Sequence, residues 1–192
     1  MSEAGLTVAI ALIGRDELVG RIDRLVAERI SVLLVGPSGA GKSALIDVIV
    51  RGVSCERVDP LEHISPMRAA RLRRRLDAGV VMIGAARTLD RRQMGAVGRI
   101  AWRFRVVRVP PLTNTDMGEV IRRTLTADIS TGAHADAWIR NLARCAGGLP
   151  GYGRALAEAG VSYWRRRGAL PTLEWTVVEA LTAGLKRDRL SD

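Results

Sequence analysis

The stretch Gly36-Pro-Ser-Gly-Ala-Gly-Lys42-Ser43 matches the pattern G-x-x-x-x-G-K-[ST] at every fixed position. Residues 31–35 before it (Ser-Val-Leu-Leu-Val) are almost all apolar, which is typical of a short strand buried on both faces of a parallel sheet. From Lys42 to about Arg51 apolar residues recur at helical spacing, for example at Leu45 and Ile49. The order of strand, glycine-rich turn and helix predicts a loop that binds phosphate.

The spacing within the loop suits that chemistry. Its three glycines permit backbone angles in which successive N–H groups turn inward and form a nest for an anion, and the start of the helix adds its positive dipole end. Lys42 is expected to reach the β- and γ-phosphates of a nucleoside triphosphate, and Ser43 is expected to bind Mg²⁺. We therefore expect ATP with Mg²⁺ as ligands. The residues expected to hold them are Gly36, Pro37, Ser38, Gly39, Ala40, Gly41, Lys42, Ser43 and Ala44.

Strand and helix patterns alternate up to about residue 111. Further strands are expected at 55–59, 80–86 and 105–109, and helices at 16–29, where Asp16 can serve as the cap, and 66–78. This alternation predicts an α/β fold with a parallel sheet flanked by helices. After Pro110-Pro111 the patterns at 116–127, 134–146, 152–167 and 173–186 are all helical, which predicts a small all-α lid subdomain. The expected domains are residues 1–111 and 112–192.

The composition of the 192 residues is that of a globular protein. Hydrophobic residues make up 47% and charged residues 26%, which excludes wholesale disorder. The apolar runs are far shorter than the ~20 residues of a membrane helix, and no signal pattern opens the sequence. We expect a cytoplasmic protein with no membrane contact. The two cysteines are isolated and there are only two histidines, so no zinc site is predicted.

The chain is strongly basic, with a net charge of +10, and its basic residues are arginines except for Lys42 and Lys186. One predicted helix carries arginines at 68, 71, 73, 74 and 75, and another ends in Trp164-Arg-Arg-Arg167. Such surfaces attract polyanions, so DNA is an expected partner, bound through its backbone because no base-reading motif is present. The alternative is that an arginine-rich composition places these side chains on solvated helix faces.

Leu12-Ile-Gly-Arg-Asp-Glu-Leu18 resembles the "GR-x-E" segment that opens the nucleotide-binding domains of AAA+ and STAND-type ATPases. In those families the segment lies against the adenine ring. The resemblance therefore implies that Leu12, Ile13 and Gly14 contact the base.

Two later segments resemble other parts of the AAA+ core. Residues 84–93, 98–104 and 106–111 are similar to the stretch from sensor 1 through the arginine finger to the last core strand, which makes Arg99 and Arg103 the finger candidates and implies a homo-oligomer. Residues 147–154 (Gly-Gly-Leu-Pro-Gly-Tyr-Gly-Arg) resemble the lid turn that delivers a sensor 2 arginine, here Arg154.

Among AAA+ proteins, the small stand-alone form resembles the transposition-type ATPases (the MuB, TniB and IstB group). This implies a protein whose ATP-bound subunits assemble, engage DNA without regard to sequence, and hand a target to a recombinase. Two alternatives remain open: a nucleotide-gated oligomeric adaptor that recruits a protein partner without DNA, and a STAND-type switch module.

The sequence departs from this family where an apolar Walker B strand should end in Asp-Glu. The nearest segment supplies Asp59, has proline at position 60, and offers Glu62 as a substitute base. Only 16 residues separate Ser43 from Asp59, because 59 − 43 = 16, so one of the family's five strands is missing. If the edge strand is missing, Asp59 is the Walker B residue on the Mg²⁺ side; if the Walker B strand is missing, Asp59 merely ends an edge strand. Either way a weak ATPase, or ATP binding without turnover, is expected.

Overall fold

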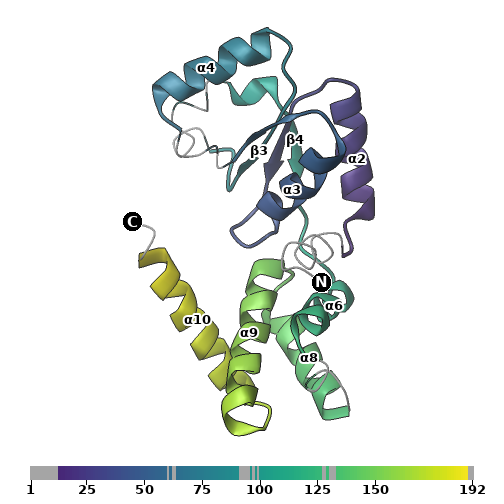
Figure 1. Cartoon of the computed structure of the whole chain (residues 1–192), viewed down its shortest axis with the longest axis vertical. Coiled ribbons are helices and arrows are strands. Elements are labelled where there is room, and N and C mark those ends of the chain that lie inside the picture. Colours follow the sequence, from purple (N-terminus) through teal and green to yellow (C-terminus); the bar gives the residue numbers. More distant parts are fainter. Residues whose placement is uncertain are drawn as a thin grey trace. The chain divides into compact units, whose positions relative to one another are not determined.

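The computed structural model describes residues 13–59, 61, 64–90, 96, 98, 100–126, 129 and 133–189, with backbone only at 133 and 184–189. The chain divides into two units, Met1–Pro110 and Pro111–Asp192, and each is described by itself. The first unit is an α/β layer structure and the second is helical (Figure 1).

Among the described residues, the sheet of the first unit has four parallel strands in the order β2-β3-β1-β4. They are β1 (Val32–Val35), β2 (Glu56–Val58), β3 (Met82–Ala86) and β4 (Arg105–Arg108). Every residue of the two central strands β1 and β3 is buried, whereas β2 and β4 expose part of their length. The predicted α/β fold and its strands are confirmed, with strand ends shifted by one or two residues.

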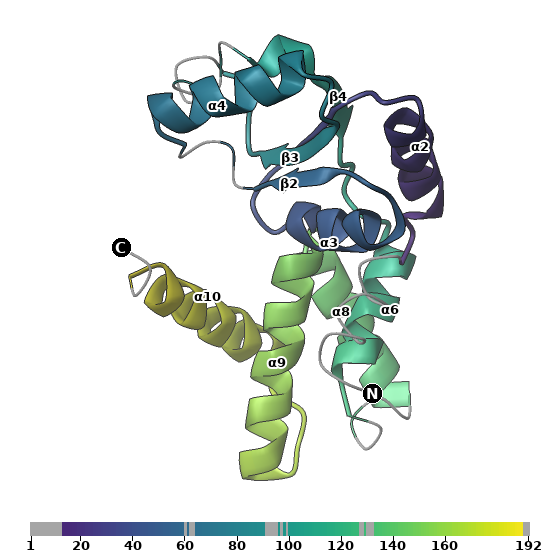
Figure 2. The same ribbon diagram turned by 45° about the horizontal axis from the view of Figure 1, so that its top comes forward.

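Helices cover both faces of this sheet. On one side α3 (Lys42–Gly52) packs against β2 and β3, and α2 (Asp16–Ala27) packs against α3 and β1. On the other side lie α4 (Pro66–Asp77) and the short 3₁₀ helix η2 (Ala101–Arg103). Figure 2 shows β2 and β3 between α3 and α4. Leu33, Leu72 and Phe104 share the core on the α4 side, so this layer excludes water from the sheet.

Two of the helix starts that differ from the predictions have an identifiable cause. Asp16 was expected to cap α2, but it is the first helical residue, and the capping position belongs to Arg15. Arg15 is 3% exposed and its Nη1 donates a hydrogen bond to the carbonyl oxygen of Pro110 at 2.5 Å. This tertiary contact fixes the start of the helix in place of a local cap. In the second unit the helix expected from Asp116 begins earlier, because Thr113 Oγ1 accepts a hydrogen bond from the Asp116 N–H at 3.1 Å.

In its described ranges, the second unit contains α6 (Asn114–Thr124), α8 (Ala133–Cys145), α9 (Pro150–Arg167) and α10 (Leu173–Arg189). The long helix α9 packs against the other three (Figure 1). Trp138 of α8 is 7% exposed and lies so close to Gly160 of α9 that a side chain there would meet its ring. The turn before α9 requires a glycine at 148, where φ is +76° and a Cβ would lie 2.7 Å from the Leu112 carbonyl oxygen.

None of the helices described is both long and apolar enough to cross a membrane.

Candidate functional site

The loop from Gly36 to Gly41 joins the end of β1 to the start of α3. Gly36 lies close to the last core strand, since a Cβ there would be 3.3 Å from the carbonyl oxygen of Val109. Gly39 and Gly41 have φ angles of +77° and +86°, which favour glycine. Ala40 is 2% exposed and anchors the loop, while Pro37, Ser38 and Gly39 are exposed. Positive φ angles such as those of Gly39 and Gly41 are among the backbone angles that a phosphate nest uses.

Lys42 folds back over this loop from the first turn of α3. Its Nζ donates hydrogen bonds to the carbonyl oxygens of Gly36, at 2.7 Å, and Pro37, at 2.8 Å. The ammonium group therefore lies at the loop that the sequence predicts to hold phosphate. Ser43 follows in the same helical turn and is exposed, and Ala44 is partly buried behind it.

Asp59 follows directly after β2, at the carboxyl edge of the sheet. Its side chain is 8% exposed, and its Oδ2 accepts a hydrogen bond from Arg57 Nη2 at 3.1 Å. Arg57 also forms an ion pair with Asp47 of α3. Ser43 and Asp47 are four residues apart and therefore share one face of α3, separated by about 6 Å of helix rise. The chain Asp47–Arg57–Asp59 joins the end of β2 to the face of α3 that carries Ser43.

The strand register gives the height of Asp59 relative to the loop. Val58 is paired with Gly84, and Gly84 is paired with Leu33 of β1. Asp59 follows Val58 and therefore lies at about the level of Leu34, two residues before the loop begins at Gly36. One strand lies between β2 and β1, so the strand axes are about 10 Å apart. Nothing in the register separates the two interpretations of β2.

No group of three or more histidine, cysteine, aspartate or glutamate residues forms a metal cluster within the described part of the chain. An ion bound with ATP does not need one, because Mg²⁺ uses one or two protein oxygens together with phosphate oxygens and water. The hydroxyl of Ser43 and the carboxylate of Asp59 are oxygen donors of the kind that Mg²⁺ prefers.

Three of the predicted site residues, Leu12, Glu62 and Arg99, lie outside the described residues. Ile13 and Gly14 form a turn before α2, where Gly14 has φ +61°. The next residue is the buried Arg15, whose contact with Pro110 ties this turn to the end of the first unit. Arg15 is the arginine of the GR-x-E segment, to which the sequence analysis assigned no role of its own.

Arg103 ends the helix η2 and forms an ion pair with Asp77 at the end of α4. Its guanidinium carbon also lies 4.8 Å from the ring centroid of Trp102. Trp102 is 74% exposed, which is unusual for so large an apolar side chain. The finger candidate is therefore held by its own chain, next to an exposed indole ring.

Arg154, the sensor 2 candidate, lies on α9 in the second unit. Its Nε donates a hydrogen bond to Glu158 at 2.8 Å, and half of the arginine side chain is exposed. This is an ordinary pair of residues one helical turn apart.

The arginines of the two basic segments point to solvent. Those of α4 are all exposed, although Arg75 pairs with Glu56 of β2 at 2.8 Å and Arg73 lies 3.9 Å from Asp77. Arg165, Arg166 and Arg167 are exposed at the end of α9, and Arg166 lies 6.0 Å from the Trp175 ring. Both basic surfaces are accessible to a partner.

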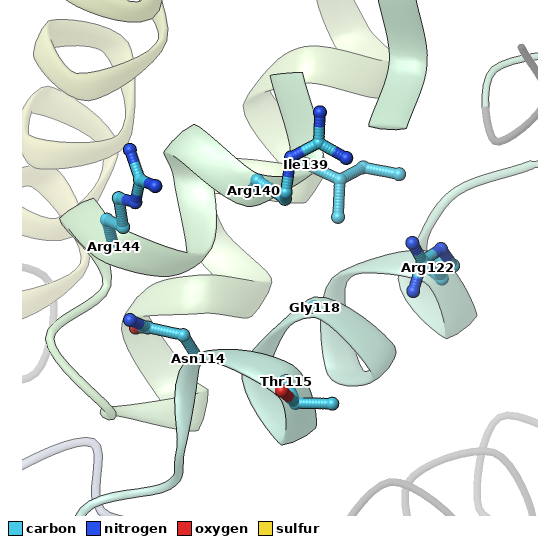
Figure 3. Close-up of a pocket in the computed structure, with 7 residues that line it drawn as sticks. All are labelled: Asn114, Thr115, Gly118, Arg122, Ile139, Arg140 and Arg144. Carbon is cyan, nitrogen blue, oxygen red and sulfur yellow. The ribbon is translucent and has the colours of Figure 1, made fainter. Parts of the chain in front are cut away.

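A third basic feature was missed by the sequence analysis. A hollow of about 280 Å³ lies between α6 and α8, wholly within the second unit (Figure 3). Seven residues line it: Asn114, Thr115, Gly118, Arg122, Ile139, Arg140 and Arg144. The four-residue spacing of Arg140 and Arg144 was visible in the sequence as a shared helix face, but the arginine of α6 opposite them could not be placed without the fold.

Two residues have shifted pKa values. Burial raises the pKa of the Cys55 thiol, and the nearby carboxylate of Asp23 adds to the shift. Burial also raises the pKa of Tyr152, with a smaller effect from Cys145. Neither residue belongs to the loop, so these shifts bear on side-chain reactivity and not on phosphate chemistry.

The fold is similar to that of a solved structure, the RuvB Holliday junction branch migration motor of Thermotoga maritima. The TM-score is 0.60 at 16% sequence identity, over 88% of this chain and 69% of that one. No family model matches the sequence, and no curated protein matches it. The chain therefore shares the α/β fold of that structure, which agrees with the predicted fold class, and at this identity the likeness shows the fold alone.

Proposed function

We propose that the protein binds ATP with Mg²⁺ at the loop of Gly36–Ser43 and uses the bound state as a switch for self-association and DNA engagement. The observation that carries the proposal is the loop itself, with two glycines at positive φ and the Lys42 ammonium group folded onto the carbonyl oxygens of Gly36 and Pro37. Inward N–H groups, a helix start and one cation are the parts that hold a polyphosphate.

Mg²⁺ fits the residues beside the loop. Ser43 would bind the ion directly and Asp59 would hold it through water, which makes Asp59 the Walker B residue. This assignment is supported by the contacts of Arg57, because they join Asp59 to the face of α3 that carries Ser43. The bound ion would neutralise charge on the phosphates.

Turnover is expected to be slow. Arg57 competes with a metal for the buried Asp59 carboxylate, and proline follows Asp59 where a water-polarising glutamate is usual in AAA+ proteins. ATP is then mainly a ligand whose presence changes the state of the protein.

Self-association and DNA contact complete the proposal. Arg103, beside the exposed Trp102, is the finger candidate that would act on the nucleotide of a neighbouring subunit. The exposed arginines of α4 and of the α9 terminus would contact DNA phosphates. The RuvB protein with a similar fold is a Holliday junction branch migration motor, which supports a DNA partner. In its most specific version, the proposal is a cytoplasmic protein with a transposition-type role and a recombinase as its protein partner.

A second function is an adaptor that assembles with ATP and recruits a protein without DNA, or a STAND-type switch. The exposure of Trp102 favours it, because exposed tryptophans often anchor protein interfaces.

The test is size-exclusion chromatography with light scattering. The full chain is run without nucleotide, with ADP and with a slowly hydrolysed ATP analogue, each with and without duplex DNA. Assembly only with the analogue and DNA together supports the DNA-engaging ATPase, and assembly with the analogue alone supports the adaptor. A monomer in every condition contradicts both.

A further inference from the structure

We propose that the hollow between α6 and α8 binds the phosphodiester backbone of a nucleic acid. The inference rests on the DNA engagement proposed above and assigns one contact surface for it. The hollow is separate from the nucleotide loop, since all its lining residues belong to the second unit. It lies outside the two basic segments that the sequence singled out.

The charge of the hollow is positive on both sides. Arg140 and Arg144 approach from α8 and Arg122 from α6 (Figure 3). Arg122 shares its charge with Asp136, whose Oδ1 lies 3.1 Å from Arg122 Nη2. Arg140 and Arg144 are exposed, and neither forms an ion pair with any residue in the described ranges. Three arginines against one carboxylate leave a net charge of about +2 that no other side chain at the hollow offsets.

The polar groups around the arginines also suit phosphate. Asn114 and Thr115 lie in the first turn of α6, where the helix dipole favours an anion and side-chain amides and hydroxyls commonly contact phosphate oxygens. Gly118 adds no side chain to the hollow, and a Cβ at this position would have its nearest neighbours, Arg122 Nη1 and Ile139 Cγ2, at 3.9 Å. A tetrahedral phosphate group can therefore be met by donors from both helices.

The shape of the cluster favours a strand of phosphates over other anions. Arg140 and Arg144 are separated by about 6 Å along α8, which is close to the spacing of neighbouring phosphates on one DNA strand, so each arginine can contact its own phosphate. The lining has one aliphatic residue, Ile139, and no aromatic ring, so it offers no pocket for the apolar anchors of a peptide and no platform for stacked bases. Backbone phosphates are the ligand that these groups fit.

The experiment measures binding of a fluorescein-labelled 25-base-pair duplex to the full chain by anisotropy, with the ATP analogue present and at several salt concentrations. The variant is Arg140→Ala/Arg144→Ala. Its control is Arg21→Ala/Arg51→Ala, which removes the same charge from exposed positions on α2 and α3. We expect the first variant to lower the slope of log affinity against log salt by about 2 and to weaken binding about 10- to 100-fold at 0.1 M salt. The control should keep nearly all of its affinity.

Gly118 supplies a second pair of variants that does not remove an arginine. Gly118→Ala adds a methyl group whose nearest neighbours would lie at 3.9 Å, an ordinary van der Waals distance, so it should bind DNA within a few-fold of the wild type. Gly118→Glu places a carboxylate among the arginines and should weaken binding as strongly as the double arginine variant. Retained ATP binding and a cooperative melting transition show that each variant is folded.

Equal DNA binding by the wild type and the Arg140/Arg144 variant overturns the assignment of the hollow and leaves the proposed function intact. A wild-type protein that fails to bind DNA at low salt contradicts DNA engagement itself. A poly-glutamate peptide serves as the competing anion. If the peptide binds the wild type as tightly as the duplex does, and the Arg140→Ala/Arg144→Ala variant loses both ligands equally, the surface recognises acidic protein and this inference is wrong.

Discussion

Arg57 of β2 donates a hydrogen bond from its guanidinium group to the buried carboxylate of Asp59, two residues further along the chain, at 3.1 Å. The same guanidinium reaches Asp47 on α3. One arginine thus holds two carboxylates, of which only Asp59 is mostly buried. Because Arg57 holds both carboxylates, the effects of replacing Asp59 and Asp47 on Mg²⁺–ATP binding can be compared directly.

Replacing Asp59 should weaken the binding of Mg²⁺ with ATP and leave the binding of ATP without Mg²⁺ nearly unchanged. We expect Asp59→Asn to weaken binding of Mg²⁺–ATP by about tenfold, as is common when an outer-sphere partner of a metal is lost, while binding of ATP in EDTA changes little. Calorimetric titration in both buffers measures this. Asp47→Asn is the matched control, since it removes the other carboxylate held by Arg57. Equal affinities for both variants would mean that β2 is only an edge strand.

Replacing Lys42 should remove nucleotide binding. In Lys42→Ala the loop loses its cation and the two hydrogen bonds to Gly36 and Pro37, so a drop of at least 100-fold in ATP affinity is expected. Equilibrium titration with a fluorescent ATP analogue measures it. Arg51→Ala, at the far end of the same helix, should bind normally. An unchanged Lys42→Ala affinity contradicts the phosphate assignment.

Trp102 should matter for assembly and not for nucleotide binding. We expect Trp102→Ala to weaken ATP-dependent self-association by more than tenfold, as for a central interface tryptophan, with ATP affinity unchanged. Light scattering over a concentration series measures it. Val178→Ala removes another exposed apolar side chain, 63% exposed, from α10 and should assemble normally. Equal loss in both variants would point to a general effect of surface hydrophobicity.

Two glycines should respond in opposite directions to a methyl group. Gly84→Ala places a Cβ against Leu61 and 2.8 Å from the Val58 carbonyl oxygen, so the free energy of unfolding should fall by about 1–3 kcal/mol. Gly20→Ala lies on α2 with nothing within 4 Å and should raise it by about 0.5–1 kcal/mol. Urea unfolding followed by circular dichroism measures both. A stable Gly84→Ala protein would mean that β2 and β3 are not packed as described.

The two thiols should differ in reactivity. Cys145 is exposed, whereas Cys55 is partly buried and burial raises its pKa. A raised pKa lowers the thiolate fraction near neutral pH, so iodoacetamide should label Cys145 first. Labelling of Cys55 should keep rising with pH after an ordinary thiol has reached its plateau. Mass spectrometry of the peptides measures both rates, and in guanidinium chloride the two cysteines should react alike.

The sequence predicted the central strands well because burial on both faces leaves an apolar run, as in Val32–Val35. It predicted the glycine-rich turn because Gly39 and Gly41 stand where the backbone has positive φ angles, which favour glycine. It placed the start of α6 late, although Thr113 and Asp116 form a capping pattern that was there to be recognised.

What the sequence could not supply depends on contacts between distant residues. Arg15 is buried because Pro110 offers it a carbonyl oxygen 95 positions away. Arg103 is held by Asp77, and the arginines of the hollow come from two helices. In a chain with 28 arginines, no local pattern distinguishes these from solvated ones.

The charged residues of the outer strands have a consequence for how copies of this protein can meet. β2 and β4 are the two ends of the described sheet, and each carries charge where β1 and β3 are apolar. Glu56 forms an ion pair with Arg75 of α4, and Arg57 forms one with Asp47 of α3, so this three-residue strand is bound to helices on both faces of the sheet. A short, charged edge resists extension by a foreign strand and protects against aggregation. Assembly by adding strand to strand is therefore disfavoured, and subunits are left to join through their helical and loop faces.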